Sequence, residues 1–181
     1  MPNDLLLDLT RRYLEPQRHY HTLEHVAAML HAGRAFPLDE EQTMAVWFHD
    51  AVYDPQSQQN EMKSARLAGK WLARLGWQTE SIERVGRIVL DTKAHVPTTA
   101  KSAPVLDLDL MSLAAPWPEF EANTAAIRRE YAHVPDEAFT AGRKAFFGEM
   151  LQRTRLFFTD WGDRLEAPAR ANLERAIGGG G

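Results

Sequence analysis

The sequence predicts an all-α fold that forms a single helical domain over residues 1–177. Apolar side chains recur at steps of three and four residues in one segment after another, which is the periodicity of helices that bury one face. The one alternating stretch, VLDLDL, has no second strand to pair with. A chain of 181 residues suits one domain with a substantial core. The terminal glycines, residues 178–181, are expected to form a disordered tail.

The first three helices follow from this spacing and from the residues at their boundaries. Near the N-terminus, four apolar side chains predict an amphipathic helix: Leu6, Leu9, Tyr13 and Leu14. A second helix is expected from about Tyr20 to Ala35, because Pro37 cannot continue it. The acids Asp39–Glu41 suit the start of a third helix, and its apolar middle, residues 44–48, predicts burial on all sides.

Glycines and polar stretches separate the remaining helices. Asn60 is expected to cap a helix that runs to about Leu75 and stops at Gly76. A polar loop, HVPTTAKSAP, precedes VLDLDLMSLA, which we interpret as a short helix with acids on part of its surface. The other predicted helices comprise residues 81–91, 117–134, 136–154 and 166–178.

The composition argues against several classes of protein. Lys plus Arg number 21 and Asp plus Glu number 25, so the net charge of −4 gives no general attraction to nucleic acid or to anionic membranes. Without cysteine, the chain has no disulfide, thiol nucleophile or thiolate metal site. The acidic N-terminus does not resemble a signal peptide, and no apolar run approaches the roughly 20 residues of a membrane span. We therefore expect a soluble, cytoplasmic protein without membrane contacts.

Three groups of ionisable side chains interrupt the apolar segments: His21 with His25, His49 with Asp50, and Asp107 with Asp109. Each group alone is also typical of a polar helix end or of a surface position. Together they offer the imidazole and carboxylate ligands that a divalent ion such as Mn, Mg, Fe, Ni or Zn takes when thiolate is absent. Two imidazoles and two carboxylates leave open positions in a six-coordinate shell, and a hydrolytic metal centre needs these for water and a phosphoryl oxygen.

In this order the groups resemble the signature of the HD superfamily of metal-dependent phosphohydrolases, in which a His, a His-Asp doublet and a distant Asp lie on a helical bundle. The closer likeness is to a bacterial subgroup of predicted HD phosphohydrolases, through the segments RHYHTLEHV, WFHDAVYD, NEMKSA, DLDL, IRREY and GRKAFFGEML. The likeness extends from about residue 10 to residue 175. It implies an HD-type helical bundle and a metal ion bound by His25, His49, Asp50 and Asp109.

The last ligand of this set has two candidates, because both Asp107 and Asp109 precede a leucine. The family commonly places a hydrophobic and then a small polar residue after this aspartate. The stretch DLMS, which starts at Asp109, fits that pattern better. Residues two positions apart on a helix point in directions that differ by about 200°, so only one of the two aspartates is expected to face the metal.

The resemblance also gives roles to residues beside the ligands. YHTLEH is similar to the YHNxxH stretch of cyclic-nucleotide phosphodiesterases, with Thr22 in place of Asn, and in those enzymes the first His is a general acid. His21 is therefore a candidate proton donor, about 6 Å from His25 across one helical turn. The alternative is that His21 makes a hydrogen bond to a metal ligand. Asp50 or Asp109 would orient the attacking water.

Charged residues near these segments are candidates for substrate contacts. Three of them could bind a phosphate: Arg18, Lys93 and His95. A solvated helix start or a polar loop also explains each of them. Asp54 and Glu61 could assist a second metal, and His95 could join them. Arg128–Tyr131, which match IRREY, could support the site through buried salt bridges or line its mouth.

These assignments predict a phosphohydrolase that cleaves a phosphoester by attack of metal-activated water. The expected substrate is a nucleotide or a related small phosphate; nucleic acid is disfavoured by the charge, and a homodimer is compatible with the sequence. A metal- and nucleotide-binding sensor with little turnover is the alternative, since it would use the same ligands while His21 stayed idle. A di-iron oxygenase is disfavoured, because only His95 lies between the doublet and the final aspartate.

Overall fold

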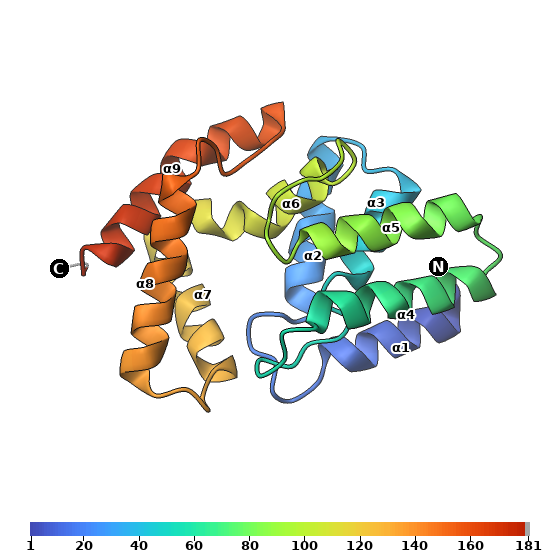
Figure 1. Cartoon of the computed structure of the whole chain (residues 1–181), viewed down its shortest axis with the longest axis horizontal. Coiled ribbons are helices and arrows are strands. Elements are labelled where there is room, and N and C mark those ends of the chain that lie inside the picture. The colour runs from blue at the N-terminus through green and yellow to red at the C-terminus, as the bar shows by residue number, and fades with distance from the viewer. Residues whose placement is uncertain (180–181) are drawn as a thin grey trace.

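The computed structural model describes residues 1–179, which form nine α-helices and two short 3₁₀ helices and contain no strand. The expected all-α fold is confirmed. In chain order the elements are α1 (Asn3–Tyr13), α2 (Leu23–Ala32), η1 (Gly33–Ala35), α3 (Glu40–Phe48), α4 (Asn60–Arg74), α5 (Thr79–Asp91), α6 (Ala103–Leu110), η2 (Met111–Ala114), α7 (Trp117–Glu130), α8 (Asp136–Gln152) and α9 (Asp160–Ile177). Figure 1 shows α1–α5 on one side of the molecule and α7–α9 on the other, with α6 between them.

Two separate sets of buried side chains form the core. The first set packs α1–α6 together and includes Leu9, Met29, Phe48, Leu72 and Val89. The second set packs η2 and α7–α9 together and includes Phe120, Phe147, Met150, Phe157 and Leu173. We call the part formed by α1–α6 the N-terminal bundle and the part formed by η2 and α7–α9 the C-terminal lobe. Each part has its own apolar centre, so the boundary between them is where polar side chains can meet.

Helix α1 uses a different apolar stripe from the one expected. Leu5, Leu9 and Tyr13 are buried, whereas Leu6 is 40% exposed and Leu14 is 67% exposed. The buried residues are four apart and therefore lie on one face of the helix. The sequence of α1 has two overlapping apolar faces, and the one that packs against the core includes the Tyr13 ring. The Tyr13 hydroxyl donates to a backbone carbonyl of α3.

The second helix begins later than expected, whereas the third begins where the acids predict. Thr22 is in an extended conformation, so α2 starts at Leu23 and the preceding residues 19–22 form bends. Asp39 caps α3: its side chain accepts from the backbone N–H of Gln42, and the Gln42 side chain accepts from the N–H of Asp39. Residues 44–48 are all at least partly shielded from solvent, as expected for a central helix.

Helix α4 ends as predicted but is not capped by Asn60. Gly76 follows the helix with a φ of +79°, a left-handed conformation that suits glycine. Asn60 instead lies inside α4, and its side-chain amide bonds to the backbone N–H and carbonyl of Asp54. It therefore closes the 54–60 loop. Helix α5 starts at Thr79, two residues before the expected position.

The last helix is longer than the sequence suggests. It begins at Asp160 instead of residue 166, because Thr159 caps it by accepting from the N–H of Gly162. Pro168 favours a start near residue 166, because proline is typical of the first turn of a helix; in the structure Pro168 lies inside α9. Of the predicted tail, Gly178 and Gly179 form a turn, and residues 180–181 lie outside the described residues. None of the helices within residues 1–179 has the length and apolar character of a membrane span.

Candidate metal centre

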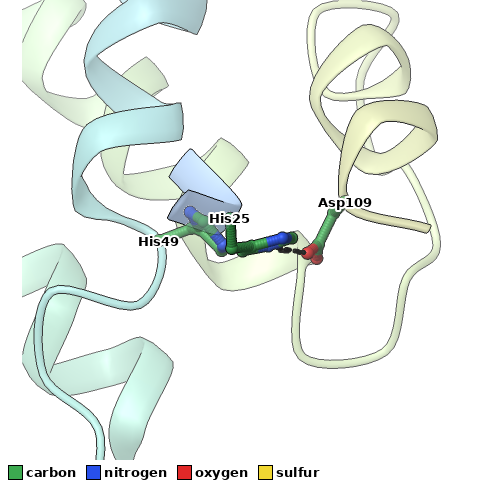
Figure 2. A group of neighbouring side chains, drawn as sticks. All are labelled: His25, His49 and Asp109. Carbon is green, nitrogen blue, oxygen red and sulfur yellow. Dashed lines mark hydrogen bonds and ion pairs between the residues drawn. The ribbon is translucent and has the colours of Figure 1, made fainter. Parts of the chain in front are cut away.

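Three side chains of the N-terminal bundle meet at one point. His25 extends from the first turn of α2, His49 directly follows α3, and Asp109 lies in the last turn of α6. One nitrogen or oxygen atom from each residue lies within 4.8 Å of the corresponding atoms of the other two. Figure 2 shows the imidazole of His25 directed at the Asp109 carboxylate, with His49 beside it. This cluster could hold a metal ion.

The imidazole of His49 is oriented to bind a cation. Its Nδ1 lies 2.8 Å from the carbonyl oxygen of Val46 and donates to it, so the lone pair is on Nε2. Among residues 1–179 this buried Nε2 has no hydrogen-bond partner, although Asp50 Oδ2 lies 3.1 Å away. A buried ring nitrogen without a partner is costly, and a cation beside it would remove that cost. The residues present therefore fit a metal ion.

The charges around the cluster also favour a cation. Nε2 of His25 lies 3.2 Å from Asp109 Oδ1, and Nε2 of His49 lies 3.7 Å from the same oxygen. Burial alone would raise the pKa of Asp109, but hydrogen bonds from His25 and His95 hold it well below its ordinary value. Burial likewise lowers the pKa of His49, yet the carboxylates of Asp50 and Asp109 outweigh it and raise that pKa to about 9. A proton and a metal ion therefore compete for the same position.

Asp50 and His95 border the three clustered residues. Asp50 Oδ2 lies beside His49 Nε2, where it can complete a ligand set or accept a proton from water. Nε2 of His95 lies 3.3 Å from Asp109 Oδ2. The backbone of His95 has a φ of +48°, which is uncommon for a residue with a side chain. Arg153 stabilises this conformation by donating to the His95 carbonyl oxygen at 3.0 Å.

Asp109, and not Asp107, faces the cluster. The carboxylate of Asp107 is fully buried and points toward the start of α9. It accepts from the backbone N–H of Phe158 at 2.7 Å and from the N–H and hydroxyl of Thr159 at 2.8 and 2.6 Å. The expectation that the two aspartates point in different directions holds, and Asp107 anchors α9 to α6.

His21 lies near the cluster, but contrary to expectation it is not on the same helix as His25. It stands in the bends before α2, so His21 and His25 do not share a helix. Their ring centroids are nevertheless 6.3 Å apart, close to the predicted separation. Glu130, at the end of α7, fixes this segment by accepting from the backbone N–H groups of residues 19–21 at 2.7–3.0 Å. The other Glu130 oxygen lies 2.7 Å from His21 Nδ1 and accepts from the Tyr53 hydroxyl.

The partners of His21 favour its protonated form. Burial would raise the pKa of Glu130, but its bonds with His21 and the backbone amides lower that pKa to about 2. Burial lowers the pKa of His21, whereas the charge of Asp50 and the bond to Glu130 together raise it above its ordinary value. Because Nδ1 is bound to Glu130, Nε2 is the nitrogen left to meet a ligand. Of the IRREY segment, Glu130 thus supports the site, while Tyr131 lines its cavities.

Arg18 does not bind phosphate in this arrangement, contrary to the sequence-based prediction. Its side chain is fully shielded from solvent. The guanidinium donates to the carboxylate of Glu15 and to the carbonyl oxygens of His21, Asp50 and Ala51. Arg18 therefore ties the bends before α2 to the segment after α3. The sequence leaves Arg18 open to phosphate or to solvent because two of the carbonyls that it binds, those of Asp50 and Ala51, are more than 30 residues away.

Lys93 and His95 do line a cavity, together with His21, Asp50 and Glu61. This cavity is polar and has a volume of about 320 Å³. Nζ of Lys93 donates to a backbone carbonyl of the 54–60 loop and lies 3.9 Å from the Glu61 carboxylate. Asp54 is exposed and bonds within its own loop, so it takes no part in the lining.

A second and larger cavity of about 500 Å³ shares His21, His95, Asp109 and Tyr131 with the first and is mostly apolar. Helices α7 and α8 form much of its wall and contribute Phe120, Ile127, Phe139, Arg143 and Phe146. Sequence reasoning missed these residues, whereas for Glu130 it left a buried supporting role and a place at the mouth of the site as alternatives. The only signals for them are the segments IRREY and GRKAFFGEML, which do not indicate where their side chains point.

Comparison of the chain with models of known protein families matches none of them, and comparisons with curated proteins and with solved structures give no significant match. The geometry of this chain and the motifs of its sequence are therefore what indicate a functional site.

Proposed function

We propose that the protein is a metal-dependent phosphohydrolase of the HD type, acting on a nucleotide or a related small phosphoester. One observation carries the proposal: His25, His49 and Asp109 come from three helices and meet at a buried ring nitrogen that has no partner within residues 1–179. The sequence resemblance to the HD superfamily selects the same residues independently of this geometry.

In this proposal the three clustered residues hold the cation and Asp50 completes the set. Imidazole and carboxylate donors suit Mn, Fe, Ni or Zn, and a larger share of carboxylate favours Mg. When bound, a divalent cation supplies Lewis acidity, which activates water and polarises a phosphoryl oxygen. Asp50 accepts a hydrogen bond from the attacking water with the carboxylate oxygen that does not face His49.

His21 acts as the general acid in this scheme. Its Nδ1 is bound to the Glu130 carboxylate, which fixes the ring and stabilises the imidazolium form. Its Nε2 is then the atom that donates a proton to the leaving oxygen. Both cavities include His21 in their lining, so an ester bound in either one can reach this nitrogen.

The test is a screen of phosphomonoesters, phosphodiesters and nucleotides with protein loaded in turn with Mn, Mg, Fe, Ni and Zn. We expect turnover with at least one metal, and its loss in Asp109→Asn, because that substitution removes a charged ligand from the cluster. The matched control is Asp54→Asn, an exposed carboxylate that lines neither cavity. If the wild type cleaves no phosphoester with any of these metals, the proposal is wrong, and nucleotide binding without turnover would then favour a sensor.

A further inference from the structure

The composition of the 500 Å³ cavity limits what kind of molecule can fill it. Its apolar lining comes from η2, the end of α6, α7 and α8, and includes Leu110, Leu113, Phe120, Ile127, Phe139 and Phe146. The lining also carries polar side chains such as Ser112, Asn123 and Thr124, but most of its surface is apolar, so a sugar or polyol would regain only part of the hydrogen bonds that it loses to water. An aromatic or aliphatic group would instead remove apolar surface from water. The volume suits a small organic ligand.

Arg143 is a cation in this wall that lacks a countercharge. Its guanidinium carbon lies 4.4 Å from the centroid of the Phe147 ring and 5.5 Å from that of Phe146. Its Nε is buried without a hydrogen-bond partner, and no ion pair joins it to a carboxylate in the described part of the chain. Burial lowers the pKa of Arg143, and only Tyr20 and Tyr131 act in the opposite direction. An anionic partner would strongly stabilise the charged form of a guanidinium in such surroundings.

The position of Arg143 separates it from the candidate metal centre. His95 lies next to Asp109, and the ring centroids of His95 and Phe146 are 6.4 Å apart. Arg143 stacks on Phe146 and Phe147. Phe146 therefore lies next to both His95 and Arg143, and no ion pair or hydrogen bond joins Arg143 to Asp109 or His95 within residues 1–179. A phosphoryl group near Asp109 would be met by His95 and His21, which leaves Arg143 for a different anionic group of the same molecule.

We propose that this cavity binds the organic part of the substrate, and that the substrate is a phosphoester whose aromatic or aliphatic group carries a second anionic group that pairs with Arg143. The inference rests on the proposed phosphohydrolase function and narrows its substrate class. It assigns specificity to the C-terminal lobe, whereas the reaction itself depends on the N-terminal bundle.

Binding can be measured without turnover by using phosphonates, which have no ester bond to cleave. The probes are methylphosphonate, phenylphosphonate and the ortho, meta and para isomers of carboxyphenylphosphonate, titrated calorimetrically into the metal-loaded protein. We expect phenylphosphonate to bind about tenfold more tightly than methylphosphonate, because the ring is removed from water. At least one carboxylated isomer should gain a further factor of about ten through Arg143.

Two pairs of variants separate the contributions of the cavity. Arg143→Met keeps an unbranched apolar stem, so it should lose the gain from the carboxylate and keep the gain from the ring. Lys144→Met, an exposed neighbour on α8, should keep both. Gly142→Leu should abolish the gain from the ring, because Gly142 lines the cavity and a Cβ there meets no atom within 4 Å. Gly148→Leu, equally open but outside the cavity, is its control.

The outcomes distinguish this inference from the proposed function. Equal affinity for methyl- and phenylphosphonate, or a carboxylate gain that survives Arg143→Met, would overturn the inference. The corresponding phosphate esters are assayed in parallel for release of inorganic phosphate. Binding in the expected order without any release would refute the hydrolase and keep the cavity assignment. Release that does not depend on the organic group would support the hydrolase and refute the cavity assignment.

Discussion

The N-terminal bundle and the C-terminal lobe contribute different parts of the site. The bundle supplies all three clustered residues, each at or near the end of a helix that also contributes buried side chains to the first core. The lobe supplies the apolar wall, Arg143 and Glu130, and none of the clustered residues. The groups proposed for chemistry therefore stand on the more extensive core, while the groups proposed to select a ligand stand on the smaller one.

One buried carboxylate from each part reaches into the other. Asp107, on α6 of the N-terminal bundle, accepts three hydrogen bonds from Phe158 and Thr159 at the start of α9. Glu130, on α7 of the C-terminal lobe, accepts three backbone N–H groups from residues 19–21. Together with the bonds from Arg153 to the carbonyl oxygens of Ala94 and His95, the contacts of these two carboxylates join the two parts. Substitutions at these residues should reveal how far the two regions are independent.

The largest effect is expected at Asp107. In Asp107→Ala, two backbone N–H groups and a hydroxyl lose their acceptor, which should lower the free energy of unfolding by about 3 kcal/mol. Urea denaturation at neutral pH measures this change. Asp109→Asn, two residues away and measured in chelator, should change the stability by less than Asp107→Ala does, because the amide oxygen can still accept a hydrogen bond from His25 or His95. A loss below about 1 kcal/mol in Asp107→Ala would show that α9 does not depend on this contact.

A second substitution tests the same contact from the side of α9. A Cβ added to Gly162 would overlap the carboxylate of Asp107 and the side chain of Phe157. Gly162→Ala should therefore destabilise the protein by about 2 kcal/mol, even though alanine has a higher helix propensity than glycine. Gly86→Ala, in the open middle of α5, should instead be neutral or stabilising. Equal stabilities of the two variants would contradict the close approach of α9 to Asp107.

The next effect concerns the proposed proton donor, which stands where the two regions meet. His21→Gln should lower kcat by about 100-fold, a loss typical of a general acid, without changing the bound metal. Glu130→Gln should lower kcat by about tenfold, because the neutral amide still accepts hydrogen bonds but no longer stabilises the imidazolium. Steady-state kinetics together with metal analysis measure both changes. Unchanged kcat in His21→Gln would remove the acid role, and loss of metal would assign His21 to the metal set instead.

The smallest effect lies in the N-terminal bundle, far from the cavity wall. Hydrogen bonds from Arg84, together with Lys101, hold the pKa of Glu41 down to about 2. Because the folded pKa is lower than the ordinary value, this carboxylate stabilises the protein above about pH 4.5 and loses that contribution as the pH falls toward 2. Arg84 and Lys101 are 47% and 42% exposed, so the contribution is only about 1 kcal/mol.

Glu41→Gln gives the measurement of this contribution. The difference in unfolding free energy between wild type and variant should be present at pH 7 and should vanish near pH 2. Glu40→Gln, the neighbouring exposed acid without these partners, is the control. A difference that is the same at both pH values would show that the effect of Glu41 does not come from its charge.

The helices were predictable from local patterns, since periodicity, the Asp39 cap and the Gly76 stop all lie within a few residues of what they determine. The bends before α2 were not predictable in this way. The four-residue spacing of His21 and His25 is that of a helix, but Glu130 captures the N–H groups of residues 19–21 from more than 100 residues away. A contact between residues so far apart cannot be predicted from the local sequence.

The candidate site was predictable to the extent that it depended on residue type and order. His25, His49 and Asp109 were selected by a resemblance, and the structure places them together. The roles of Arg18 and Arg143 could not be predicted, because the sequence does not show which guanidinium bonds within the protein and which remains available to a ligand. Arg18 bonds to carbonyls of a distant segment, whereas Arg143 faces rings from α8 and has no acidic partner in residues 1–179.

The central claim is that His25, His49 and Asp109 form a metal centre, and direct metal titration tests it most simply. We expect the wild type to bind one divalent ion per chain, and His25→Ala, His49→Ala and Asp109→Asn each to weaken that binding by at least about 100-fold. His31→Ala, at an exposed histidine on the same helix as His25, should bind as the wild type does. A wild type that binds none of Mn, Mg, Fe, Ni and Zn, or cluster variants that bind as tightly as the wild type, would contradict the account.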